Sequence, residues 1–421
     1  NHRLLLQRTK HPNPLLTMEK KKNTPKLRFP EFTGEWEEKK LGHFFKDLKT
    51  GMTPYRGNLD YFKGRIPWIT SGELCYNIIL KTNEYITEQA IKDTNLKIYE
   101  PNTLFIAITG LEAPGTRGKC ALNGIPAATN QSCMAFEAHP NINTRFLFYW
   151  YNKYGTFLYY KYAQGTKQQS FNNAIVENFD FIYSTLAEQT KIATFLTAVD
   201  EKLTQLKKKK TLLEQYKKGV MQKLFSQELR FKDDNNQDFP DWQELPGNYI
   251  FKNVSDKNHI SELPILAITQ EYGAIPRELI DYNITVTDKS VDSYKVVQIG
   301  DFIISLRSFQ GGIEYSKYNG ICSPAYIILR PIMEIEDCFF KSFFKTELYI
   351  KALNKNIEGI RDGKMISYKY FSEINLPYPS LPEQQKIATF LSAIDEKISH
   401  SSAQIEKMEA WKKGLLQQML V

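Results

Sequence analysis

Two stretches of the chain decide its architecture: STLAEQTKIATFLTAVDEKLTQLKKKKTLLEQYKKGVMQKLF at residues 184–225, and PSLPEQQKIATFLSAIDEKISHSSAQIEKMEAWKKGLLQQML at residues 379–420. A constant shift of 195 residues aligns them without a gap, and twelve of the fifteen positions from Glu188 to Lys202 are identical. Close self-similarity at a fixed offset is the signature of an internal repeat. The chain therefore contains two related halves.

Each stretch has the apolar spacing of a long helix. Apolar residues return in alternating steps of four and three, which is typical of helices that pack along a shared seam. We predict an antiparallel pair of helices, each roughly 50 Å long. Thr185 with Glu188, and Ser380 with Glu383, predict a capping box at the start of each helix. The predicted seam consists of Ile192, Leu196, Val199, Leu203, Leu206, Leu213, Val220, Ile387, Leu391, Ile394, Ile398, Ile405, Met408 and Leu415, with polar interruptions at Lys210, Lys217, Ser401 and Lys412.

Further apolar side chains lie on the outer faces of the predicted helices. An exposed row of this kind indicates docking sites for other subunits, although packing on the neighbouring domains would explain it equally well. The candidate interface residues are Phe195, Leu212, Tyr216, Phe390, Trp411 and Leu416.

A weaker repeat precedes each helix. LRFPEF at residues 27–32 leads to Trp36, and LRFKDD at residues 229–234 leads to Trp242. The regions between these motifs and the helices contain short strand-like runs, turn residues and aromatic-rich helical stretches, which predict mixed α+β domains. We therefore divide the chain into a first domain at 18–184, a first helix at 185–226, a second domain at 227–379 and a second helix at 380–421. We expect Met18 to be the true start and residues 1–17 to be a non-native or upstream leader.

Composition excludes several classes of protein. The 421 residues are 42% hydrophobic and 24% charged, which is typical of folded domains rather than of a disordered tail. The net charge of +8 favours an acidic partner only mildly. No apolar run approaches the roughly eighteen residues of a membrane span, so we expect no membrane association. Five scattered cysteines argue against disulfides and a metal site, and favour the reducing cytoplasm.

The sequence shows no familiar catalytic motif. Gly359, Gly363 and Lys364 have the wrong spacing for a phosphate loop, and the six histidines are not clustered. Asn375-Leu376-Pro377-Tyr378 resembles the N-P-P-Y motif of amino-methyltransferases, but it is explained more simply as the strand that leads into the second helix. We therefore expect a binding protein without catalytic residues of its own.

Two diverged domains held by near-identical helices suit the recognition of two different short elements at a fixed separation. DNA offers such elements, because equivalent groove positions recur about every 34–36 Å. Two alternatives stay open. The chain could be a coiled-coil scaffold or adaptor that binds proteins, or a methyltransferase with an unrecognised site.

The chain resembles the specificity subunits of type I restriction–modification enzymes from about Lys26 onward. The most specific motif is L-x-E-Q-x-K-I-A-x-F-L-x-x-[VI]-D-x-K, which occurs at residues 186–202 and again at 381–397. The first half also contains the family's G-x-T-P, I-P-W-I and T-N-Q segments at residues 51–54, 66–69 and 129–131. The second half departs from this pattern, because it has no clear G-x-T-P segment and no tryptophan after Pro264.

The resemblance implies an α+β fold of two mixed α/β target-recognition domains, joined by two long antiparallel coiled-coil helices in a pseudo-twofold repeat. Each domain would bind one half of a bipartite sequence in double-stranded DNA. The helices would set the spacer and dock two methyltransferase subunits, and restriction–translocase subunits would complete the endonuclease complex. S-adenosylmethionine, ATP and magnesium would belong to those partners, and this chain would hold no cofactor or metal.

Base edges are read by forked or amide side chains on loops, and phosphates by Lys, Ser and backbone N–H groups. In the first domain, the candidate DNA-binding residues are Lys49, Thr53, Tyr55, Arg56, Ser71, Glu73, Thr109, Arg117, Lys119, Lys167, Gln168 and Gln169. In the second domain they are Gln270, Glu271, Arg277, Arg307, Ser308, Gln310, Tyr315, Lys317, Arg361 and Lys364. We expect the loop at residues 307–312 to be the best single candidate, with Lys207–Lys210 near phosphates between the half-sites.

Overall fold

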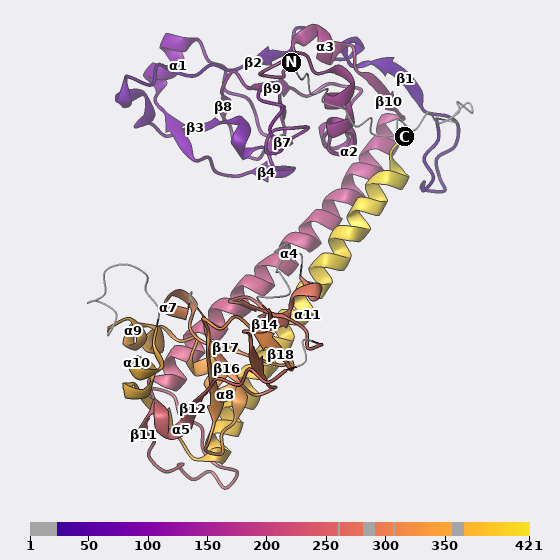
Figure 1. The fold of residues 1–421 in the computed structure, drawn as a ribbon. Coiled ribbons are helices and arrows are strands. Elements are labelled where there is room, and N and C mark those ends of the chain that lie inside the picture. Colours follow the sequence, from indigo (N-terminus) through magenta and orange to yellow (C-terminus); the bar gives the residue numbers. More distant parts are fainter. Residues whose placement is uncertain (1–22, 260–261, 281–290, 306–307, 356–365) are drawn as a thin grey trace, which may run out of the picture. The chain divides into compact units, whose positions relative to one another are not determined.

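A computed structural model describes residues 23–259, 262–280, 291–305, 308–355 and 366–421 (Figure 1). The predicted leader lies outside these residues. The chain forms two compact units: unit 1 is Asn1–Gln205 with Ile405–Val421, and unit 2 is Leu206–Gln404. Each unit therefore contains parts of both long helices.

The repeated stretches form the two longest helices, α4 (Leu186–Phe225) and α11 (Leu381–Met419), which lie side by side (Figure 1). In unit 1, Lys412 Nζ lies 2.6 Å from Asp200 Oδ1; in unit 2, Lys217 Nζ lies 2.6 Å from Asp395 Oδ1. The shift of 195 residues converts one ion pair into the other, so the helices are antiparallel and related by a pseudo-twofold. At about 1.5 Å per residue, the 40 residues of α4 span about 60 Å, more than the expected 50 Å.

The seam between the helices is apolar along most of its length. All of the predicted seam residues are buried or half-buried. Ser401, one of the polar interruptions, is 1% exposed, and its hydroxyl donates to the carbonyl oxygen of Lys397 at 2.8 Å. Lys217 and Lys412 are satisfied by their aspartates. The polar positions are therefore accommodated by local hydrogen bonds and ion pairs.

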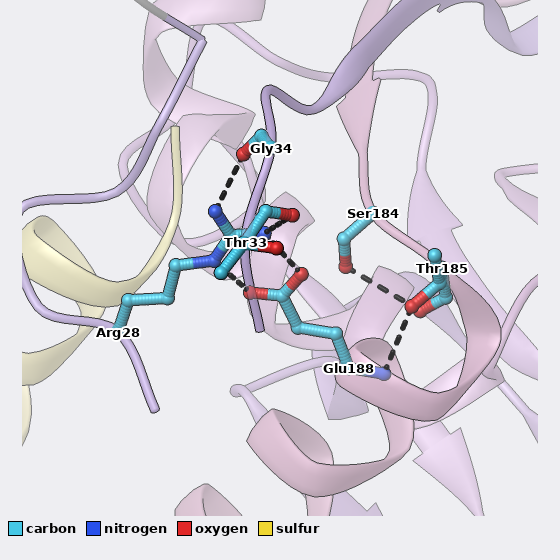
Figure 2. A network of polar contacts seen from close by, with 6 residues as sticks. All are labelled: Arg28, Thr33, Gly34, Ser184, Thr185 and Glu188. Carbon is cyan, nitrogen blue, oxygen red and sulfur yellow. Dashed lines mark hydrogen bonds and ion pairs between the residues drawn. The ribbon is translucent and has the colours of Figure 1, made fainter. Parts of the chain in front are cut away.

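The predicted capping boxes are not formed as expected. The carboxylate of Glu188 instead binds the guanidinium of Arg28, with Oε1 2.7 Å from Nε and Oε2 2.8 Å from Nη2 (Figure 2). Glu383 binds Arg230 in the same way, at 3.1 and 3.0 Å. A bidentate charged pair is stronger than the single bond that a capping glutamate makes to a backbone N–H. One half of the first capping box is formed, because the Thr185 hydroxyl accepts from the backbone N–H of Glu188 at 3.4 Å.

The short L-R-F repeat is thus a clamp on the start of each long helix. Next to the arginine, Phe29 packs edge-on against Phe195, with ring centroids 5.8 Å apart. In the other half, Phe231 packs against Phe390 at 5.4 Å. The clamp buries the glutamate and covers one aromatic side chain of each helix, which explains why this motif recurs with the helix.

Unit 1 contains a five-stranded sheet in the order β2-β9-β6-β7-β4 and a three-stranded sheet in the order β5-β3-β8. Only the pairs β3–β8 and β4–β7 are parallel within these two sheets. Helix α2 is rich in aromatic residues and packs between the larger sheet and the N-terminal half of α4 (Figure 1). The elements are β1 (Glu37–Lys40), β2 (Lys49–Thr50), β3 (Ile66–Ile69), β4 (Asn77–Ile79), β5 (Glu84–Ile86), α1 (Glu88–Thr94), β6 (Leu104–Ala107), β7 (Cys120–Asn123), β8 (Ala128–Thr129), β9 (Cys133–Phe136), α2 (Thr144–Tyr162), α3 (Asn173–Glu177) and β10 (Asp180–Tyr183), and β1 pairs antiparallel with β10.

Unit 2 contains a four-stranded antiparallel sheet in the order β12-β19-β16-β17, with the pairs β13–β14 and β15–β18 beside it. As predicted, the N-L-P-Y segment is the strand before the long helix, and it pairs with β11. The elements are β11 (Gln243–Pro246), α5 (Gly247–Ile250), β12 (Phe251–Val254), β13 (Leu266–Thr269), β14 (Gly273–Pro276), β15 (Lys295–Val297), β16 (Phe302–Ile304), α7 (Ser308–Gly311), β17 (Glu314–Tyr315), β18 (Gly320–Cys322), β19 (Ile327–Pro331), α8 (Asp337–Phe343), α9 (Glu347–Lys355), α10 (Tyr368–Glu373) and β20 (Asn375–Tyr378).

Within the described ranges, none of the helices has the length and apolar character required to cross a bilayer. The five cysteines are unpaired thiols. Burial raises the pKa of Cys133 and Cys322 to about 12, which keeps both groups protonated and unreactive at neutral pH.

Candidate nucleic-acid interface

Three of the motif segments noted in the sequence meet in unit 1. The backbone N–H groups of Gly51 and Met52 donate to the carbonyl oxygens of Asn130 and Thr129, both at 3.1 Å. The buried indole of Trp68 donates to the Met52 carbonyl oxygen at 3.2 Å. The G-M-T-P loop therefore lies along the T-N-Q segment, over the tryptophan of I-P-W-I.

Gly51 is the point at which these segments come closest. A Cβ atom on this residue would lie 1.7 Å from the carbonyl oxygen of Thr129 and 2.3 Å from its carbon. These are backbone atoms that hold a strand end, so they cannot move aside cheaply. The glycine is required for the two loops to share one surface.

The two loops present polar side chains to one another. The Thr53 hydroxyl donates to Gln131 Oε1 at 2.6 Å. This bond fixes the amide so that its NH₂ group faces away from Thr53, and Gln131 is exposed. An amide with a fixed orientation is a suitable reader of adenine. Gln131 was absent from our candidate residues, although the T-N-Q motif that contains it was recognised.

Other candidates in this region are already engaged within unit 1. Arg56 forms a bidentate ion pair with Glu84, and its guanidinium carbon lies 4.5 Å from the ring centroid of Phe62. The Glu73 carboxylate accepts from Thr70 N and Asn83 N, both at 2.8 Å. These two residues shape the surface rather than offer unpaired groups to a ligand. Lys49 and Tyr55 are exposed, and Ser71 is half-buried.

A second group of candidates lies on two loops, residues 109–119 and 164–170, that hold each other in place. Thr109 forms a β-bridge with Ser170, and Gln169 N donates to Glu112 Oε2 at 2.9 Å. Arg117 is fixed by this network, because its guanidinium donates to the carbonyl oxygens of Leu111 and Glu112 and to the Tyr160 hydroxyl. Lys119 Nζ stands 4.4 Å from the ring centroid of Tyr76, and Lys167 and Gln168 are exposed at the loop tip.

The two groups adjoin at the end of β6. Ile108 N donates to the carbonyl oxygen of Ser132 at 2.9 Å, next to Gln131, and the Ile108 carbonyl oxygen accepts from Phe171 N at 2.8 Å. The structure therefore brings the twelve candidates of the first domain to neighbouring loops and strand ends at one edge of the sheet. We call this edge the unit 1 loop surface.

In unit 2, a smaller group collects around β14. Gln270 and Glu271 are exposed in the turn between β13 and β14, beside Tyr272, which is 59% exposed and was not among our candidates. Exposed Lys317 follows a parallel bridge between Ala274 and Ser316, which places it beside β14. We call these residues, together with Arg277 at the end of β14, the unit 2 loop surface.

Arg277 is the most unusual member of that surface. Its Nε and Nη1 atoms are buried and lack a hydrogen-bond partner among the residues that the structure describes. Buried guanidinium N–H groups without acceptors cost free energy, so this arginine is held in an unfavourable setting.

Several candidates of the second domain do not fit a direct contact. Ser308 is 1% exposed, and its hydroxyl accepts from Ser305 N at 2.9 Å, so it closes a turn instead of reaching a ligand. Tyr315 packs on Phe302 and donates to Asp337 Oδ2 at 2.8 Å; burial raises the pKa of this hydroxyl. The expected loop after β16 includes the short helix α7, which carries exposed Gln310. Arg307, Arg361 and Lys364 lie outside the described residues.

The predicted subunit-docking residues divide into exposed, half-covered and buried sets. Leu212 and Tyr216 are each 53% exposed and Trp411 is 49% exposed. The shift of 195 residues converts Tyr216 into Trp411, so each half presents an aromatic side chain at the same helix position. Phe195 and Phe390 are instead half-covered by the L-R-F clamps. Leu416 is only 9% exposed, because it joins the core of unit 1, and its expected exposure is wrong.

The described residues contain no group of three or more His, Cys, Asp or Glu side chains that could hold a metal ion. The Lys207–Lys210 run lies on α4, with the first three side chains exposed and Lys210 3.7 Å from Glu214.

Comparison with known proteins places the chain in a family. The model of the type I restriction modification DNA specificity domain matches residues 33–215 and again residues 244–410. The type I restriction enzyme MjaIX specificity subunit of Methanocaldococcus jannaschii is 22% identical over 411 residues, covering 92% of this chain and 93% of that protein.

Two solved structures have a similar fold. The S subunit of a type I restriction–modification system from M. genitalium aligns with a TM-score of 0.57 at 19% identity, over 94% of this chain and 99% of that one. A chain whose structure concerns complex assembly and conformational transition of the type I R–M system aligns with a TM-score of 0.54 at 16% identity, over 91% and 97% of the two chains.

Proposed function

Since the chain belongs to the type I restriction–modification DNA specificity family, we propose that its two loop surfaces each bind one half of a bipartite DNA sequence. The observation that carries the proposal is the junction of three separate motif segments at Gly51, Trp68 and Gln131. This junction is far from the repeated helices in sequence, and it displays amide, hydroxyl and cationic groups on fixed loops. Such groups read base edges and phosphates.

Unit 2 would bind the other half-site through different chemistry. Its loop surface has Arg277, Lys317 and Tyr272 around one strand, and the sequence of the second half has no clear G-x-T-P segment. Two surfaces of different composition in one chain suit an asymmetric sequence. The continuous helix α4, with its antiparallel partner α11, would keep the gap between the half-sites constant.

The same chain would act inside a larger complex and contribute no catalysis of its own. Tyr216 and Trp411, repeated on the two helices, support docking of two methyltransferase subunits. Restriction–translocase subunits would join that assembly, and the work would take place in the cytoplasm. S-adenosylmethionine, ATP and magnesium would be bound by those partners.

A domain exchange tests the proposal. Residues 227–378 are replaced by the equivalent segment of another family member, and the methylated motif is sequenced in cells that express the methyltransferase partner. We expect one half-site to change and the other to stay the same. A simultaneous change of both halves would contradict separate recognition.

Binding by the wild-type complex provides the control. DNA affinity should fall steeply as salt rises, because bound Lys and Arg release counterions from phosphates. Affinity for protein partners without any salt-dependent DNA binding would favour the scaffold alternative.

A further inference from the structure

Unit 2 contains a cavity of about 660 Å³ between the long helices and the turn that joins α8 to α9. Its helix wall includes Lys217, Gln222 and Phe225 of α4 and Asp395 of α11, and its opposite wall includes Thr346. A cavity of this size is typical of ligand sites.

The internal repeat shows what fills the same place in unit 1. Helices α2 and α8 begin at equivalent points: Asn143 N donates to Gln189 Oε1 at 2.9 Å, and Glu336 N donates to Gln384 Oε1 at 3.0 Å. Because Gln189 and Gln384 are one repeat apart, residue 143 corresponds to residue 336. Tyr149 therefore corresponds to Ser342, and Lys153 to Thr346.

In unit 1 these two side chains occupy the space between α2 and the long helices. The Tyr149 hydroxyl donates to Asp200 Oδ2 at 2.9 Å, and Lys412 Nζ lies 5.9 Å from its ring centroid. Lys153 Nζ donates to the carbonyl oxygens of Gln417 and Leu420, at 3.3 and 2.8 Å. The repeat converts Asp200, Lys412, Gln417 and Leu420 into Asp395, Lys217, Gln222 and Phe225, which all belong to the helix wall of the cavity.

Unit 2 thus has a helix wall equivalent to that of unit 1 but lacks the side chains that fill the adjoining space in unit 1. Ser342 and Thr346 are too short to replace a phenol ring and a lysine stem, and α8 ends at Phe343, where α2 would continue. By the repeat, a ring beside Lys217 would place its hydroxyl beside Asp395, as Tyr149 lies beside Lys412 and donates to Asp200, and Asp395 retains its ion pair to Lys217. The rim is polar, with Lys218 Nζ 2.7 Å from Glu347 Oε1. An apolar floor with a charged rim is the usual anatomy of a protein-binding hot spot.

We propose that this cavity is a docking pocket for a tyrosine side chain of the methyltransferase partner, with the phenol hydroxyl donating to Asp395. The site is the unit 2 equivalent of a position that unit 1 fills with its own Tyr149. The inference rests on the proposed function only for the identity of the partner. Chemistry of the pocket is independent of DNA recognition.

The pocket is tested with p-cresol, the isolated tyrosine side chain, titrated into the full-length protein and followed by NMR and by a crystal structure with p-cresol. We expect one saturable millimolar site in unit 2, at least about tenfold weaker binding of toluene, and no binding by Ser342→Tyr. Tyr149→Ser should acquire a second site in unit 1. No saturable site, equal binding of toluene, or unaltered binding by Ser342→Tyr would overturn the assignment.

The partner is tested separately with the purified methyltransferase subunit. Ser342→Tyr should weaken its affinity at least about tenfold, whereas Asn235→Tyr, which adds the same side chain to an exposed turn of unit 2, should not. An unchanged affinity would overturn the partner assignment even if p-cresol binds. Wild-type DNA binding, measured alongside, distinguishes this result from failure of the proposed function.

Discussion

Asp200 in unit 1 and Asp395 in unit 2 occupy the same position of the repeated helix, and each pairs with the lysine of the opposite helix. Their surroundings differ. In unit 1, Tyr149 packs beside the pair and donates to the carboxylate, whereas in unit 2 the pair borders an open cavity. The helix sequence therefore conserves the contacts between the helices, and the diverged domain decides the environment of each contact.

The largest expected effect comes from removing the arginine of an L-R-F clamp. Arg28→Met leaves the Glu188 carboxylate, whose side chain is 2% exposed, without its charged partner. We expect the free energy of unfolding of unit 1 to fall by about 3–5 kcal/mol, with an equal loss in unit 2 for Arg230→Met. Hydrogen exchange resolved by peptide would measure both, with exposed Arg65→Met as the control. Unequal losses would show that the two clamps are not equivalent.

Gly51→Ala tests a feature that unit 1 alone is expected to have. Its Cβ atom would overlap the Thr129 backbone, and overpacking of this kind typically costs about 1–3 kcal/mol or more. We expect local opening of the loops, with loss of recognition of one half-site. Gly72→Ala is the matched control, since its nearest neighbour is 4.0 Å away. Sequencing of methylated motifs measures which half-site is still recognised. A change in the half-site that unit 2 binds would contradict this prediction.

Gln131→Ala sharpens the comparison of the two loop surfaces. Loss of an oriented amide should reduce discrimination at one base pair by about 1–3 kcal/mol, without a change in thermal stability. Competition binding with single-base variants of the recognised site would measure this effect. Discrimination lost at bases of both half-sites would show that the surfaces do not act separately.

The smallest effects come from the paired aspartates. Asp200→Asn weakens bonds to both Tyr149 and Lys412 at a site where the Asp200 side chain is 28% exposed, and we expect a loss of about 1–2 kcal/mol. Asp395→Asn affects a pair whose carboxylate is 48% exposed, so the loss should stay below about 1 kcal/mol. Thermal unfolding of both variants provides the measurement. A larger loss of stability in Asp395→Asn than in Asp200→Asn would contradict the expectation that the ion pair beside the cavity contributes less to stability.

The helices could be predicted closely from sequence because their signal is local and occurs twice. The expected stretches, 184–225 and 379–420, differ by no more than two residues at either end from α4 and α11. Their caps could not be predicted in this way. Arg28 lies 160 residues from Glu188 in the sequence, and no local sequence pattern predicts that its guanidinium binds the Glu188 carboxylate.

The candidate sites were predicted by residue type, and their engagement depends on the fold. Arg56 and Arg117 have the right chemistry for DNA but are bound by Glu84 and by the 111–117 loop. Tyr315 has a surface-compatible side chain but is half-buried, and its hydroxyl donates to Asp337. Residue type indicates what a side chain can bind, whereas its neighbours in three dimensions decide whether it is available.

The composition of unit 1 has a consequence for synthesis of the chain. Its core needs Leu415 and Met419 of the last helix as well as residues that emerge at the start. At about 5–20 residues per second, the ribosome takes about 10–40 s to produce the segment between Gln205 and Ile405. During that interval α11 provides no apolar partner for Ile192, Leu196 and Val199. The core of unit 1, most of which is translated first, is therefore completed last.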